Sequence, residues 1–270
     1  MSCKNWFVSK QAMLSSLAAA TALCFSAAAS AAPSAFDGGL PGGWTGLGGY
    51  GTSGADGVVT ASPEGGAYGW VSTNGGVSGA SLPGIGGANG SLLRSSAFSA
   101  NAGDSLEFYF NYITSDGGAY TDYAWARLLF ADLTEVAVLF TARTALDGNS
   151  VPGFGMPDIK ADIDPQFVTT TPGAPAWLPL GSSSGTCFDD GCGYTGWVKS
   201  TYSIANAGDY ILEFGVANWD DEFYQSGLAF DGITVGGQAI DPNPVPEPAS
   251  LALLGLGLAG LAWRGRRRAA

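Results

Sequence analysis

Apolar and polar residues alternate in short segments through the middle of the chain. The segments that show this period of two are residues 106–112, 124–130, 136–140, 210–216 and 228–235. No stretch between residues 35 and 245 carries a long 3.6-residue period, and turn-forming Gly, Ser, Asn and Pro separate the segments. This pattern predicts an all-β fold, an antiparallel β-sandwich in which one face of each sheet lies in the core.

The tetrapeptide Asn-Ala-Gly-Asp occurs twice, at residues 101–104 and 206–209. In each copy the glycine suits a backbone position with positive φ, and the aspartate can cap its own turn. Each copy precedes an alternating segment that contains Leu-Glu-Phe. Because the flanking sequences diverge, we expect two equivalent edges of one double-layered fold rather than a tandem repeat.

The first 31 residues have the layout of a secretory signal peptide. Lys4 and Lys10 precede an apolar, alanine-rich stretch over residues 12–29, and Ala29-Ser30-Ala31 offers the small residues that signal peptidase reads. A permanent membrane helix is the alternative, but the apolar core is short. We expect the mature chain to start near Ala32.

The last 30 residues have a three-part layout. A proline-rich linker over residues 241–248 is followed by an apolar run over residues 249–263 and an arginine-rich tail over residues 264–270. As a helix the run would span roughly 22 Å, at about 1.5 Å per residue, which makes a short membrane tether. Arginines at its end would hold the tail in the cytoplasm.

This layout resembles the PEP-CTERM sorting signal of Gram-negative bacteria, and also the so-called ice-binding protein C-terminal motif. The residues that carry the resemblance are Val245, Pro246, Glu247, Pro248, Arg264, Arg266, Arg267 and Arg268. The resemblance implies that an exosortase, a membrane protease-transpeptidase, recognises the Pro-Glu-Pro and removes the tail near Glu247. We therefore expect an inner-membrane-tethered precursor and an exported product.

The segment between the two signals is strongly acidic. It holds 5 basic and 22 acidic residues, and the chain contains no histidine. Electrostatic binding to nucleic acid is excluded by this balance. The absence of histidine excludes Ser-His-Asp and Cys-His centres and the usual zinc ligation. Cations and neutral glycans are the partners that such a segment suits.

Two cysteines remain after removal of the predicted signal peptide, Cys187 and Cys192. In an oxidising compartment this pair predicts a disulfide across the Asp-Asp-Gly turn between them. A redox centre is the alternative, but the spacing is not Cys-x-x-Cys. The bridge would pin one loop.

Clustered carboxylates raise the question of a cation site. The candidate ligands are Asp220, Asp221, Glu222 and Asp231. Oxygen ligands on loops suit Ca²⁺, which takes six to eight of them. An acid-rich, solvated hairpin loop is the alternative.

Tryptophans in Gly-rich or Pro-rich surroundings are candidates for sugar binding. They are Trp44, Trp70, Trp177 and Trp197. Flat aromatic faces stack on the apolar faces of sugar rings. Aromatic plugs that close the ends of the sandwich are the alternative.

Gly-Asp-x-Leu-x-Phe occurs at residues 103–108, and Gly-Asp-Tyr-Ile-Leu-Glu-Phe at residues 208–214 is followed by Ser-Gly-Leu-Ala-Phe-Asp-Gly-Ile at residues 226–233. With this pattern the body of the chain also resembles secreted jelly-roll domains that occur with this sorting signal. The resemblance covers residues 90–238, within a sandwich core predicted over residues 91–240 after a Gly-rich part over residues 32–90. Such domains are similar in outline to carbohydrate-binding modules. We expect a non-enzymatic cell-surface or extracellular-matrix protein that is associated with exopolysaccharide or biofilm and binds glycan. A secreted polysaccharide-active enzyme using Asp and Glu is the alternative.

Overall fold

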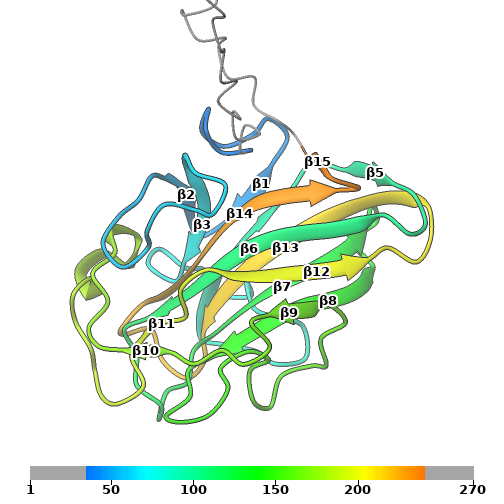
Figure 1. Ribbon diagram of the computed structural model, residues 1–270. Coiled ribbons are helices and arrows are strands. Elements are labelled where there is room, and N and C mark those ends of the chain that lie inside the picture. The colour runs from blue at the N-terminus through cyan, green and yellow to red at the C-terminus, as the bar shows by residue number, and fades with distance from the viewer. Residues whose placement is uncertain (1–34, 241–270) are drawn as a thin grey trace, which may run out of the picture. The chain divides into compact units, whose positions relative to one another are not determined.

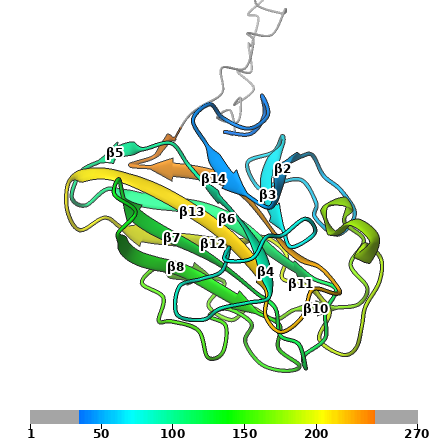
Figure 2. The same ribbon diagram turned by 180° about the vertical axis from the view of Figure 1, so that it is seen from behind.

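A computed structural model describes residues 35–240, which form two antiparallel β-sheets packed face to face (Figures 1 and 2). The first sheet has the order β1-β4-β13-β7-β8, with β5 paired to β13. Its strands are β1 (Thr45–Leu47), β4 (Asn89–Arg94), β5 (Phe98–Ala100), β7 (Tyr123–Phe130), β8 (Glu135–Arg143) and β13 (Gly208–Asn218).

The second sheet has the order β10-β11-β6-β14-β3-β2, with β12 between β6 and β9, and β15 beside β14. Its strands are β2 (Gly49–Ser53), β3 (Tyr68–Ser72), β6 (Ser105–Thr114), β9 (Asp162–Asp164), β10 (Thr171–Pro172), β11 (Gly193–Tyr194), β12 (Val198–Ser203), β14 (Ser226–Val235) and β15 (Gln238–Ala239). The Gly-rich N-terminal part contributes strands to both sheets.

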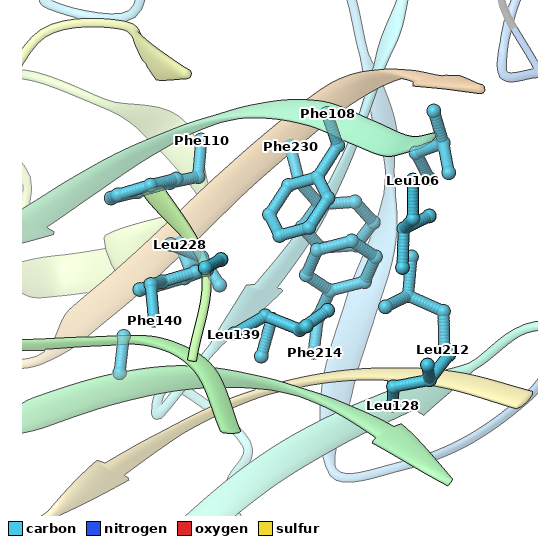
Figure 3. Packing of buried hydrophobic residues seen from close by; sticks show 14 of the residues in the cluster. Leu106, Phe108, Phe110, Leu128, Leu139, Phe140, Leu212, Phe214, Leu228 and Phe230 are labelled. Carbon is cyan, nitrogen blue, oxygen red and sulfur yellow. The ribbon is translucent and has the colours of Figure 1, made fainter. Parts of the chain in front are cut away.

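Aromatic side chains from both sheets fill the space between them (Figure 3). Phe110 of β6 stacks on Phe140 of β8, and Phe214 of β13 stacks on Phe230 of β14, each with ring centroids 3.8 Å apart. Phe108 meets Phe214 edge-on at 5.3 Å. Each of these pairs joins the two sheets, and such pairs contribute roughly 0.5–1.5 kcal/mol beyond their buried area.

The structure confirms the predicted fold class and all five predicted strand segments, which correspond to β6, β7, β8, β13 and β14. Burial alternates along the first half of β6, where one face turns into the core, whereas β7 is buried on both faces over almost its whole length.

The repeated tetrapeptide behaves differently in its two copies. Gly103 has φ +88° and Asp104 accepts a hydrogen bond from the Asn101 backbone N–H (2.7 Å), as predicted. Gly208 instead opens β13 in extended backbone. The prediction of two equivalent edges is wrong, because β6 and β13 both lie inside their sheets and face each other across the core.

Within residues 35–240 the one helical element is the 3₁₀ segment η1 (Leu178–Ser183), and no described helix is long and apolar enough to cross a membrane. The predicted signal peptide, linker, membrane helix and arginine tail lie outside the described residues.

Candidate functional site

Two of the four candidate sugar-binding tryptophans are buried. Trp44 packs edge-on against Phe36 in the main core, with ring centroids 5.3 Å apart. Trp177 directly precedes η1 and is buried in a small apolar cluster, where its indole N–H donates to the Tyr68 hydroxyl (3.0 Å). Neither ring can present a face to a sugar, so the prediction is wrong for both.

The other two tryptophans are half-buried in a small apolar cluster on the outer face of the second sheet. Trp70 lies in β3 and meets the Trp177 ring edge-on at 6.4 Å. Trp197 meets Tyr68 edge-on at 5.7 Å and donates to the Thr60 carbonyl (3.2 Å). Sugar binding by Trp70 and Trp197 stays a prediction. Their contacts show that both rings cover the buried residues of this cluster.

The four predicted cation ligands do not converge. Asp220, Asp221 and Glu222 lie in the β13–β14 loop, whereas Asp231 is buried in β14 opposite Tyr109. Five residues of extended strand separate Asp231 from the start of β14, which is roughly 17 Å at about 3.4 Å per residue. No group of three or more His, Cys, Asp or Glu within the described part of the chain is arranged to hold a metal ion.

Three loops instead meet at the end of the sandwich that is drawn lowest in Figures 1 and 2. Residues from these loops line a pocket of about 160 Å³. The loops are the β6–β7 loop, the loop closed by the disulfide, and the β13–β14 loop. Together they line the pocket with Asp116, Tyr120, Phe188, Asp221, Phe223 and Tyr224.

A disulfide between Cys187 and Cys192 closes the middle loop, and Phe188 lies inside it. This loop is tied to its neighbour by backbone hydrogen bonds. The Phe188 N–H donates to the Ser115 carbonyl (3.0 Å), and the Gly118 N–H donates to the Asp190 carbonyl (2.8 Å). The Phe188 ring is therefore held at the pocket although it is 46% exposed.

The aromatic walls contact one another across the loops. Phe188 meets Tyr120 edge-on at 5.5 Å and Tyr224 at 4.9 Å between ring centroids. Tyr224 has φ +47°, a conformation that non-glycine residues seldom adopt and that recurs at binding sites. Phe223, the next residue along the loop, is 71% exposed.

Asp116 is the most buried member of the pocket lining, with 3% of its surface exposed. The Gly117 N–H donates to its Oδ1 (2.7 Å). Burial raises the pKa of Asp116 to about 7; the Gly117 hydrogen bond opposes this shift, and the negative charge of Asp221 adds to it. Near pH 7 this carboxyl is therefore about half protonated.

A third carboxyl, Asp122, lies behind the pocket. Its Oδ2 accepts a hydrogen bond from the Ser226 hydroxyl (2.6 Å), and its Oδ1 accepts one from the Trp219 N–H (3.0 Å). Complete burial raises the pKa of Asp122 well above its usual range. Asp122 directly precedes β7, so its carboxyl links the start of β7 to the start of β14 and to the β13–β14 loop.

An arginine between two exposed rings flanks the site. The Arg143 guanidinium lies 4.8 Å from the ring centroids of both Phe154 and Trp219. Its Nε donates to the carbonyl and hydroxyl of Thr121, each at 3.0 Å. Arg143 thereby fixes two further aromatic surfaces beside the pocket.

Of the predicted metal ligands, only Asp221 lines this pocket, and none of the predicted tryptophans does. The missed signal lies in residues 219–224, where Trp219, Phe223 and Tyr224 bracket three consecutive acids. Asp116 and Tyr120 offered no comparable signal, because only folding brings their loop beside this one.

Comparison with known proteins confirms the resemblance at the C-terminus. Residues 244–268 match the PEP-CTERM protein-sorting motif. The match implies recognition by exosortase, export and processing at the membrane. No curated protein matches the chain.

Two solved structures are remotely similar. The K1 cleaved adhesin domain of Lys-gingipain from Porphyromonas gingivalis W83 is 11% identical, with 76% of this chain and 95% of that chain covered and a TM-score of 0.39. Alginate lyase AlgAT5, from polysaccharide lyase family 7, is 13% identical, with 65% and 81% covered and a TM-score of 0.32.

Proposed function

We propose that this is a non-enzymatic protein of the cell surface or extracellular matrix, which binds exopolysaccharide through the pocket between the β6–β7, disulfide and β13–β14 loops. The observation that carries the proposal is the pocket lining, which combines four aromatic side chains with two carboxylates. The sorting motif supports the destination, because it implies an exported protein.

Sugar rings have apolar faces that stack on aromatic rings and hydroxyls that donate to carboxylates. The pocket supplies both kinds of group within about 160 Å³. This volume lies below the roughly 300–1,000 Å³ of sites for drug-sized ligands. It suits one sugar ring, such as a chain end or a side branch, with further contacts to the exposed aromatic rings outside.

A glycan array with the purified exported protein tests the proposal, followed by titration calorimetry on the glycans that bind. Phe223→Ala should weaken binding roughly 2- to 10-fold, the equivalent of the roughly 0.5–1.5 kcal/mol of one aromatic contact. Phe223 is 71% exposed, so its removal should leave the fold intact.

Phe130→Ala is the matched control. Phe130 is also an exposed phenylalanine (41%), but it ends β7, at the opposite end of the strand from the pocket loops. Binding should be unchanged in this variant. Equal losses in the two variants, or an array without any bound glycan, would reject the proposal.

A polysaccharide-active enzyme is the second candidate, and one observation favours it. Asp116, with a pKa of about 7, suits a general acid, and Asp221 is close enough for its charge to act on it. The expected result under this candidate is cleavage of a bound polysaccharide that Asp116→Asn abolishes. Binding without any release of new chain ends would eliminate it.

A further inference from the structure

We propose that the pocket selects glycans that carry a free, protonated amino group, as a deacetylated amino sugar does. This inference rests on the proposed glycan-binding function and names the class of sugar that the pocket prefers.

The charges around the pocket favour a cationic group. Asp116 and Asp221 line it, and no lysine or arginine is among the lining residues. The same two loops that supply Phe188 and Asp221 add exposed acids on the outside, which are Asp189, Asp190, Asp220 and Glu222. Arg143 is engaged by Thr121, Phe154 and Trp219. Such a site attracts an ammonium group and repels uronates and sulfated sugars.

Asp116 supplies an acceptor that the protein itself leaves open. Its Oδ1 accepts the Gly117 N–H, whereas no hydrogen bond among residues 35–240 reaches its Oδ2. Burial of an ionised carboxylate costs much free energy unless a cation or several donors compensate for it. A protonated amine brings both the positive charge and three donors. A neutral hydroxyl brings one donor and no charge.

The aromatic walls add a second attraction. A cation within about 6 Å of an aromatic ring face is attracted by the ring quadrupole. Tyr120, Phe188, Phe223 and Tyr224 line the same pocket as the two carboxylates and come from all three loops. The same rings stack on the sugar that carries the amine.

A metal ion fits this pocket less well than an amine does. Ca²⁺ takes six to eight oxygen ligands, whereas two carboxylates line the pocket. Aromatic walls offer no further oxygen except the two tyrosine hydroxyls.

Titration calorimetry with three tetrasaccharides of the same β-1,4 linkage tests the inference at pH 7, where Asp116 is about half ionised. They are the glucosamine tetramer, its fully N-acetylated counterpart and the glucose tetramer. We expect the exported protein to bind the glucosamine tetramer at least 10-fold more tightly than the other two. Equal affinities would overturn the inference while the proposed function stands.

Binding of none of the three, with other glycans bound on the array, would also overturn the inference alone. An array without any bound glycan would remove the inference and the proposed function together. The two failures are therefore distinguishable.

Three charge variants identify the carboxylates involved. Asp116→Asn and Asp221→Asn should each reduce the preference for the glucosamine tetramer at least 5-fold. If Asp116→Asn does not fold, Asp221→Asn alone tests the role of the carboxylates. Asp132→Asn is the control, because it removes one negative charge from the β7–β8 turn, at the opposite end of β7. A preference that survives both pocket variants, or falls equally in the control, would overturn the assignment.

Discussion

The buried carboxylate of Glu213 shows how this acidic protein places charge inside its fold. Glu213 lies on β13, directly opposite Arg94 of β4 and Arg127 of β7. Its Oε1 accepts the Arg127 Nε–H (2.8 Å) and the Trp125 indole N–H (3.1 Å), and its Oε2 accepts the Arg94 Nε–H (2.7 Å). Two guanidinium groups thus compensate one carboxylate that is completely buried, and the group links three neighbouring strands.

Glu213→Gln should destabilise the fold by roughly 3–5 kcal/mol, because it leaves the buried Arg127 without its main counter-charge. Glu135→Gln is the control, since Glu135 pairs with the same arginine at 3.2 Å but keeps 45% of its side chain exposed. An exposed ion pair contributes about 1 kcal/mol or less. Urea unfolding of both variants measures the difference, and comparable losses would contradict this account.

The raised pKa of Asp116 predicts how stability depends on pH. A carboxyl whose pKa is about 7 in the folded state and about 3.9 when unfolded holds its proton more tightly in the folded state. Its contribution to stability is therefore complete below about pH 4 and is lost as the pH rises to about 7. Asp122 acts in the same direction.

The melting temperature should accordingly fall by several degrees between pH 4.5 and pH 8. Asp116→Asn should flatten part of this slope, because the amide does not titrate. Melting curves across this range test the point. An Asp116→Asn profile parallel to that of the unmodified protein would show that this carboxyl does not titrate as described.

At the scale of elements, the disulfide-closed loop matters for the pocket more than for the sandwich. It contributes Phe188 to the lining and contacts the β6–β7 loop through the Ser115 carbonyl. The bridge joins positions five apart in the sequence. A loop this short restricts the unfolded chain by only about 2 kcal/mol in the chain-entropy model.

Replacement of Cys187 and Cys192 together by serine should cost about 2 kcal/mol and leave the β-sheet circular dichroism unchanged. Glycan binding should weaken by more than in Phe223→Ala, because the Phe188 ring loses its support while the β13–β14 loop is intact. Unfolding measurements and calorimetry on the same protein check both parts. Loss of the sheet signal would show that the loop supports the sandwich itself.

At the scale of the whole molecule, an excess of about seventeen negative charges between the two terminal signals opposes compaction. Dissolved cations screen such repulsion without a specific site. Since Asp231 lies apart from the acids of the β13–β14 loop, Ca²⁺ and Mg²⁺ should raise the melting temperature equally at equal concentration. A larger effect of Ca²⁺ that chelator reverses would instead indicate a selective site.

Export and processing concern the whole chain as well. The mature protein should begin near Ala32 and lose its tail near Glu247, because the terminal segments have the layouts that signal peptidase and exosortase recognise. Mass spectrometry of the extracellular fraction measures both ends. Joint replacement of Pro246 and Glu247 by alanine should retain the precursor in the inner membrane, and an intact arginine tail on exported protein would contradict this expectation.

Five of the strands that form the core could be predicted from the sequence alone, and so could the sorting motif; β3, β4 and β12, which also supply core residues, were not predicted. Each prediction depends on a local pattern: alternation marks a strand with one buried face, as in the first half of β6, and Pro-Glu-Pro before an apolar run marks the tail. Local patterns are complete within a few residues, so they need no knowledge of neighbours.

The candidate site depended on tertiary structure. Asp116, Phe188 and Phe223 are far apart in the chain and meet only because the two sheets bring three loops to one end. Packing also decided which tryptophans are covered: Trp44 and Trp177 are buried by residues remote in sequence. The burial and the pKa of the Asp116 carboxyl depend on the groups that surround it in space. Local sequence patterns do not specify those groups.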